Sequence, residues 1–137
     1  MKLAAFVFAL LCLVLKVNAV PDYGHIEDWK KNVIAIIPSH GHLDHVGAVP
    51  FAASMFKDAP IISTPYTIEV IKSMVYDERL ELPNRLVPIN SNSSYKLSPT
   101  ITIEFVHITH SIPHTAVVVL HTPYGKVMYV NDFKLDD

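Results

Sequence analysis

Four side chains that can bind a metal lie within six consecutive positions of this chain: His40, His42, Asp44 and His45. Neutral imidazole suits zinc and similar transition metals, and a carboxylate is a harder ligand that a second ion would accept. Isolated histidines commonly cap helices or fill turns, but four such side chains this close together favour metal binding. In an extended loop His40 and His42 can point to one side, while Asp44 and His45 can face a neighbouring ion. The spacing therefore predicts a site with ligands for two metals.

The elements before and after this cluster are expected to position it at the edge of a sheet. The apolar run 33–37 predicts a strand that is covered on both faces and ends at the cluster. The alternating run 101–106 predicts another strand, which is followed by His110. A third predicted strand, 126–130, is followed by Asp132. Each of these loops places a possible ligand at a strand terminus, where the sites of α/β folds usually lie.

The remaining pattern predicts a mixed α/β layer structure. Thr64 and Pro65 are typical of a helix start, and Ile68, Ile71 and Val75 give the helix that continues to about residue 78 one apolar stripe. The other expected elements are a helix over 51–56, strands over 60–63 and 86–89, a polar turn over 90–94, a helix or turn over 26–31, and a hairpin of 116–120 with 126–130.

Residues 1–19 have the pattern of a secretory leader. An apolar run from Leu3 to Leu15 precedes Val17-Asn18-Ala19, which predicts cleavage after Ala19. Thirteen apolar residues are fewer than the roughly 20 that span a bilayer as a helix, which argues against a permanent membrane anchor. The alternatives are a buried helix or a leader unrelated to the rest of the chain. The only cysteine, Cys12, lies in this run, so a processed chain would form no disulfide.

The charge of the rest of the chain argues against a self-sufficient polyanion-binding module. Residues 20–137 carry 9 lysines and arginines against 13 aspartates and glutamates, a formal charge of −4. No basic patch for nucleic acid is therefore expected. Metal ions in a site can nevertheless supply positive potential that a residue count misses.

The motifs together resemble the metallo-β-lactamase superfamily, and within it the ribonuclease J group of β-CASP nucleases. The resemblance extends over 20–137 and rests on Val20-Pro21-Asp22-Tyr23, the HxHxDH run 40–45, Thr64-Pro65-Tyr66, Thr109-His110-Ser111-Ile112-Pro113 and Asp132-Phe133-Lys134. HxHxDH identifies only the superfamily, and the later loops narrow it to the nuclease group. The resemblance implies an αββα sandwich, two zinc ions, RNA as the partner, and hydrolysis of its phosphodiester bonds, often by exonuclease as well as endonuclease action.

The resemblance also implies a role for each ligand. His40, His42 and His110 would hold one ion, Asp44 and His45 would hold the other, and Asp132 would bridge them. The nucleophile would be a hydroxide shared by the two ions.

Two further roles follow the same positions. Asp44 would orient this water or exchange protons with it, which is a catalytic role. Ser111 would donate a hydrogen bond to a substrate phosphate, with a simple turn hydroxyl as the equal alternative.

Several residues depart from the family pattern or receive no role from it. His114 replaces an acidic residue, and Asn131 replaces a common glycine, a change that asparagine tolerates because it adopts positive φ better than most residues. His107 is expected to be a strand-end histidine rather than a partner of the site, and His121 is expected to be structural. His25 receives no role.

Residues 20–137 are expected to form only part of a metallo-β-lactamase domain, without its first strands, the β-CASP domain and the C-terminal part. The expected function is that of a ribonuclease J-like hydrolase with reduced or no activity. One alternative is a hydrolase of a small ester, thioester or lactam, against which the loop Ser111-Ile112-Pro113 argues. Another is a noncatalytic zinc-binding fragment. The resemblance implies a cytoplasmic protein, and a functional leader would make it a secreted one.

Overall fold

The structure is a computed structural model, and it describes residues 32–135. The predicted leader and the predicted helix or turn at 26–31 lie outside these residues. The helices are α1 (Leu43–Val46), α2 (Val49–Ala53), the 3-10 turn η2 (Ser54–Phe56) and α3 (Pro65–Asp77). The strands are β1 (Ile61–Ser63), β2 (Leu86–Pro88), β3 (Ser93–Ser98), β4 (Ile101–His107), β5 (Ala116–Thr122) and β6 (Gly125–Tyr129). This mixture of helices and sheets agrees with the predicted α/β class.

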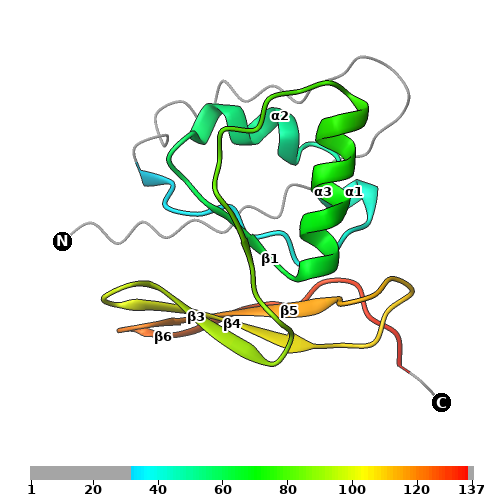
Figure 1. The fold of residues 1–137 in the computed structure, drawn as a ribbon. Helices are drawn as coiled ribbons and strands as arrows, with labels where there is room; N and C mark the ends of the chain where they lie inside the picture. The colour runs from blue at the N-terminus through cyan, green and yellow to red at the C-terminus, as the bar shows by residue number, and fades with distance from the viewer. Residues whose placement is uncertain (1–31, 136–137) are drawn as a thin grey trace.

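The elements form three layers, with the helices above a two-stranded sheet and a four-stranded sheet below it (Figure 1). Strands β1 and β2 pair in parallel, and α2 and α3 cover their upper face. One apolar cluster, which includes Ile61, Ile68 and Ile71, joins the helices to this sheet. A second cluster, which includes Ile62 and Phe105, joins the two sheets. The small sheet is therefore covered on both faces, as its apolar sequence requires.

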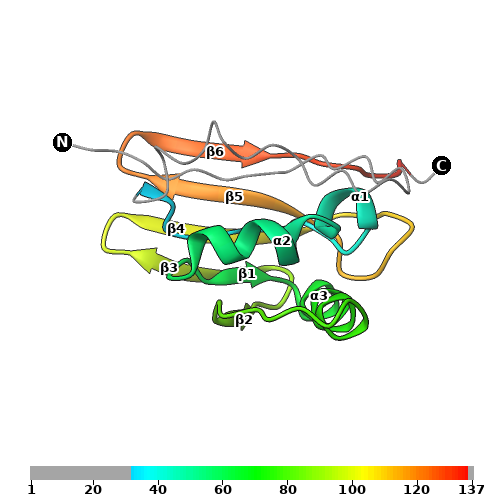
Figure 2. The ribbon, with the colours of Figure 1, turned by 90° about the horizontal axis from the view of Figure 1, so that it is seen from above.

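The four-stranded sheet has the order β3-β4-β5-β6, with every neighbouring pair antiparallel. In β4, the buried Ile101, Ile103 and Phe105 alternate with more exposed residues, so one face of the strand is turned to the core. Because β5 is antiparallel to both of its neighbours, β4 and β6 run in the same direction (Figure 2). Their carboxyl ends therefore reach the same edge of the sheet.

The segment 33–37 does not form the full strand that its sequence predicts. It makes a single bridge, Ile36 to Ile61, held by hydrogen bonds of 2.9 Å from Ile36 N to Pro60 O and from Ile62 N to Ile36 O. Its side chains nevertheless cover both sides as expected, because Ile36 packs in the upper cluster and Ile37 in the lower one. The apolar pattern thus predicted the burial of residues 35–37 correctly, but it was wrong for Ile34, which is 38% exposed, and for the length of the strand pairing.

Two other boundaries differ from the prediction. The helix expected over 51–56 begins at Val49 as α2 and ends as the 3-10 turn η2. The polar turn expected over 90–94 is wrong in part, because Ser93 and Ser94 begin strand β3. Tyr95 and Leu97 of β3 pack against the lower cluster, and this alternation is the signal that the sequence offered.

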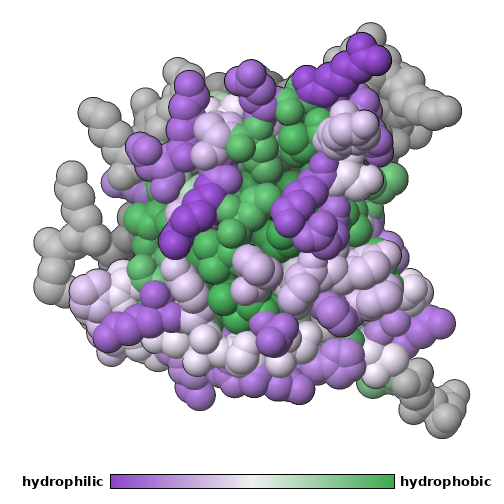
Figure 3. Space-filling model, in the orientation of Figure 1, coloured by the Kyte–Doolittle hydropathy of each residue, from purple (hydrophilic) through white to green (hydrophobic). Residues whose placement is uncertain are grey.

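Apolar side chains gather in a band across the middle of one face, between the helical layer and the four-stranded sheet (Figure 3). Strand β6 forms one edge of its sheet within residues 32–135, and its Val127 and Met128 are 59% and 60% exposed. An exposed apolar edge of this kind favours aggregation. None of the helices in the described part of the chain has the length and apolar character to cross a membrane.

Candidate metal centre

The candidate ligands come from three segments that meet at one edge of the four-stranded sheet. The loop that carries His40 is tied to the start of β5 by a hydrogen bond of 3.2 Å from Ala116 N to Ser39 O. The segment after β6 is tied to the loop after β4 by a hydrogen bond of 2.8 Å from Lys134 N to Thr109 O. These backbone bonds, together with the parallel directions of β4 and β6, bring distant parts of the sequence together.

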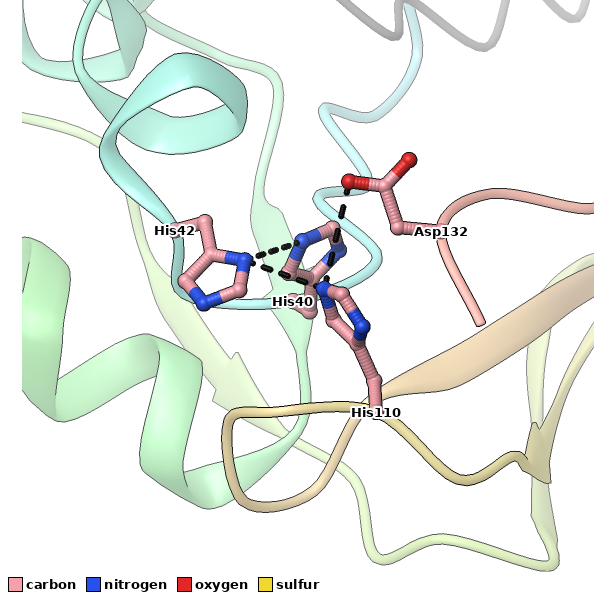
Figure 4. Close-up of side chains that lie close together, drawn as sticks. All are labelled: His40, His42, His110 and Asp132. Carbon is pink, nitrogen blue, oxygen red and sulfur yellow. Dashed lines mark hydrogen bonds and ion pairs between the residues drawn. The ribbon is translucent and has the colours of Figure 1, made fainter. Parts of the chain in front are cut away.

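The first group consists of His40, His42, His110 and Asp132, each of which offers an atom within 4.8 Å of the others. His42 Nδ1 lies 3.1 Å from both His40 Nε2 and His110 Nε2 (Figure 4). Asp132 Oδ2 lies 3.9 Å from His110 Nε2. One ring nitrogen from each of His40, His42 and His110 therefore points to the same place, beside the carboxylate of Asp132.

These spacings fit a tetrahedral metal. Nitrogen ligands at 2.0–2.1 Å from such an ion lie about 3.3 Å apart, close to the 3.1 Å between the histidine nitrogens. The outward nitrogen of His110, Nδ1, is buried and has no hydrogen-bond partner among the described residues. Three imidazoles and a carboxylate are the donors that zinc accepts.

The second group consists of Asp44, His45 and Asp132. His45 Nε2 lies 3.3 Å from Asp44 Oδ2 and 3.3 Å from Asp132 Oδ2. The His45 side chain is 9% exposed, whereas those of Asp44 and Asp132 are 52% and 49% exposed. Asp132 belongs to both groups, and the exposed carboxylates leave the centre open to a ligand from solution.

Burial, followed by repulsion from the neighbouring imidazoles of His45, His42 and His110, lowers the pKa of His40 from 6.5 to about 4. His40 is fully buried. Its ring is therefore neutral near pH 7, and a metal would not compete with a proton for it.

Close packing leaves little room for a side chain at Gly41, between His40 and His42. A Cβ atom at Gly41 would lie 3.2 Å from Val70 Cγ2 and 3.5 Å from both Tyr66 Cε1 and Ile112 Cδ1. The loop thus presses against α3 and against the loop that carries His110. This packing keeps the loop with His40 and His42 close to the loop with His110.

The other residues singled out by the sequence are distributed differently. Ser111 is exposed and lines a pocket of ≈ 350 Å³ together with His107, His110 and His114. His114 has φ +59° and its ring centroid lies 6.3 Å from that of Tyr66. His121 pairs with Glu104 at 2.6 Å, away from the centre. The structure thus gathers all six candidate ligands and leaves His107 and His121 outside the two groups.

The sequence did not reveal the contacts of Asn131. Its Nδ2 atom lies 2.6 Å from Ser39 Oγ, 3.2 Å from His40 Nδ1 and 3.0 Å from His45 Nδ1. The expectation that asparagine serves a positive-φ turn here is wrong, because the non-glycine residues of the described chain with positive φ are Arg79, Asn92 and His114. Only its place beside Asp132 hinted at the site.

Comparison with known proteins agrees with this geometry. The sequence model of the Metallo-beta-lactamase superfamily matches residues 28–136. The chain is 46% identical to a ribonuclease J of Methanocaldococcus jannaschii over 90% of this chain and 28% of that protein. It is also 46% identical to a ribonuclease J of Pyrococcus abyssi over 89% of this chain and 27% of that protein. The chain therefore spans little more than a quarter of the length of these relatives.

Solved structures share the fold. The metallo-beta-lactamase fold protein YhfI of Bacillus subtilis superposes with a TM-score of 0.59 at 20% identity, over 79% of this chain and 44% of that one. A metallo-beta-lactamase HARLDQ motif mutant of Cronobacter sakazakii superposes with a TM-score of 0.60 at 16% identity, over 81% of this chain and 46% of that one.

Proposed function

The chain belongs to the metallo-β-lactamase superfamily, and from this premise we propose that it is a metal-dependent hydrolase of RNA phosphodiester bonds with reduced activity. The observation that carries the proposal is the convergence of six histidine and aspartate side chains in two groups that share Asp132. The similarity to ribonuclease J over most of this chain supports RNA as the substrate class.

We assign the ligands by their grouping. His40, His42 and His110 would hold one ion, Asp44 and His45 would hold the other, and Asp132 would contact both. Four of these six side chains are imidazoles, which favours zinc over the harder magnesium and calcium. When bound, two such ions supply a water of lowered pKa and offset the charge of the attacked phosphate.

Asp44 is the candidate proton acceptor. Its carboxylate is half-exposed and faces His45 Nε2 at 3.3 Å, so it can reach a water at the open side of the centre. In this position it can orient that water and take its proton as the phosphate is attacked. Asp132 is less suited to this role because it is shared between the two groups.

Ser111 is the candidate contact to the substrate. Its hydroxyl is exposed in the pocket beside His110, where it can donate a hydrogen bond to a phosphate oxygen next to the scissile bond. Few cations are available elsewhere on this acidic chain, so RNA would be held chiefly at the centre itself.

The test compares RNA cleavage by three proteins. The chain 1–137 is stripped with a chelator, reloaded with zinc and mixed in excess with a 5′-monophosphorylated RNA, so that weak binding does not hide cleavage. We expect His42→Ala to abolish the cleavage seen with the wild type, because it removes a ligand of the first group. His121→Ala is the matched control, because His121 contacts Glu104 and no member of either group.

Equal cleavage by the wild type and His42→Ala would contradict the proposed function. A chromogenic lactam and a thioester, assayed in parallel, test the small-molecule alternative. Two bound zinc ions without hydrolysis of any substrate would instead support a noncatalytic zinc-binding protein.

A further inference from the structure

Asn131 lies between the two groups of candidate ligands and contacts one histidine of each. Its Nδ2 atom is 3.2 Å from His40 Nδ1 and 3.0 Å from His45 Nδ1. In both rings the opposite nitrogen, Nε2, is the one that faces other candidate ligands, since His40 Nε2 contacts His42 and His45 Nε2 contacts Asp132. The carboxamide of Asn131 therefore contacts the Nδ1 atoms of two histidines whose Nε2 atoms belong to different groups of candidate ligands.

The direction of these hydrogen bonds decides whether the rings can bind a metal. A neutral imidazole carries one proton, either on Nδ1 or on Nε2. If Asn131 donated to both Nδ1 atoms, His40 and His45 would carry their protons on Nε2, and the nitrogens that face the other ligands could not coordinate an ion. If Asn131 accepts from both, the protons lie on Nδ1 and both Nε2 lone pairs are free.

A half turn of the carboxamide satisfies the second arrangement without moving any other atom. The two ends of an amide have nearly the same shape, so Oδ1 can occupy the place of Nδ2. The oxygen would then accept from His40 Nδ1, His45 Nδ1 and the hydroxyl of Ser39, which lies 2.6 Å from this atom of Asn131 and also 3.1 Å from His40 Nδ1. Ser39 is buried, so its hydroxyl has little access to water as a competing partner.

We propose that Asn131 is a positioning residue for both metal sites: its carboxamide oxygen accepts hydrogen bonds from Nδ1–H of His40 and of His45, and so directs the Nε2 atom of each ring toward its ion. The inference rests on the proposed metal centre, and it is independent of whether RNA is the substrate. Partners of this kind behind metal-binding histidines typically change metal affinity about 10- to 100-fold when they are removed.

Three variants of the full chain test the direction of the bonds, with zinc alone as the probe. Asn131→Leu keeps the approximate shape of the side chain and removes all of its hydrogen bonding. Asn131→Asp keeps the acceptor oxygen and replaces the donor nitrogen by a second acceptor oxygen. Asn90→Leu makes the same change at an exposed asparagine outside the centre and serves as the control. Zinc affinity is measured by competition with a chromogenic chelator, and circular dichroism verifies that each variant is folded.

We expect Asn131→Leu to weaken the binding of both ions by about 10- to 100-fold. Asn131→Asp should remain within about threefold of the wild type or bind zinc more tightly, because a carboxylate is also a good acceptor for a ligand histidine. Wild-type affinity in Asn131→Leu would overturn the inference. A loss in Asn131→Asp as large as in Asn131→Leu would overturn it too, because the donor would then be the group that matters.

A second measurement needs no variant. Long-range ¹H–¹⁵N spectra of zinc-loaded wild-type protein with labelled histidine report which ring nitrogen carries the proton. Protons on Nδ1 of both His40 and His45 are expected, and coordination of zinc through Nδ1 of either ring would refute the inference. Failure of the proposed function alone gives a different result, in which zinc binds as described while RNA stays intact. A wild type that binds no zinc would overturn the metal centre and this inference together.

Discussion

Within residues 32–135, two places bring a histidine against a carboxylate, and they differ in burial and in the number of neighbouring ligands. At the metal centre, His45 meets Asp44 and Asp132 at 3.3 Å, and its side chain is 9% exposed. On the outer face of the four-stranded sheet, His121 meets Glu104 at 2.6 Å, and the two side chains are 33% and 39% exposed. The shorter contact lies in the place with fewer possible ligands.

The difference teaches that convergence, rather than contact distance, marks a metal site. His121 of β5 lies opposite Thr102 of β4, and Glu104 lies two residues after Thr102 on β4. The contact of His121 with Glu104 is therefore an ordinary diagonal cross-strand pair on one face of the sheet. His45 meets ligands from a helix and from a loop 87 residues away, beside three further imidazoles. Pairs such as His121 and Glu104 arise from local register, whereas the centre needs the whole fold.

The largest contrast is expected for zinc binding. His42→Ala should lower the affinity of the first site by more than about 100-fold, because removing a direct ligand exceeds the loss of an outer partner. His121→Ala should leave the affinity unchanged. Zinc at 100 times its Kd should stabilise the wild type by about 2.7 kcal/mol for each site, measured as a rise in Tm, and His42→Ala should lose this for one site. Equal stabilisation of all three proteins would refute the comparison.

The second-largest contrast between the two places is expected in how the free energy of unfolding depends on pH. Unfolded His40 takes up a proton near its ordinary pKa of 6.5, whereas folded His40 does so only at about 4, because it is buried among other imidazoles. Between these values the unfolded state binds more protons, so the free energy of unfolding should fall as the pH falls from 6.5 to about 4. Urea titrations of chelator-treated protein measure this slope.

His40→Asn should flatten the slope, because it removes the buried titrating ring, and His121→Ala should retain it. The same slope in His40→Asn and in the wild type would show that another group causes the dependence.

The smallest effect is expected at the pair on the sheet face. Glu104→Gln should change the free energy of unfolding by no more than about 1 kcal/mol, because exposed ion pairs contribute little. Denaturant unfolding of the variant and the wild type provides the measurement. A loss of several kcal/mol would mean that this pair stabilises the sheet far more than its exposure suggests.

The sequence singled out the six side chains that the structure brings together, because residue type and position mark them. Four of them lie within one short run, and His110 and Asp132 directly follow predicted strands. Their assignment to two groups came from family resemblance, and the structure groups the same atoms, while metal ligation itself remains a proposal. The contacts of Asn131 could not be predicted from the sequence, because its amide contacts residues 86 to 92 positions away.

Fold elements with strong local signals were predicted best. Helix α3 has a proline at its start and an apolar stripe that includes Ile68 and Ile71, and both residues are buried. The start of strand β3 was predicted as a turn, because its serines are typical of a loop and its pairing with β4 could not be seen in the sequence. In the run 33–37, residues 35–37 are buried as predicted, but the run forms one bridge instead of a strand, since pairing depends on how far a neighbouring strand continues alongside.

By itself, the sequence determined which side chains can bind a metal and which surfaces must be buried, because side-chain chemistry and apolar periodicity are local properties. Only the tertiary structure decided that the ends of β4 and β6 share one edge with the His40 loop, since antiparallel pairing through β5 is a long-range event. The tertiary structure also decided that His40 is buried among other imidazoles and that Asn131 touches two rings, because burial and hydrogen-bond partners depend on residues far apart in the chain.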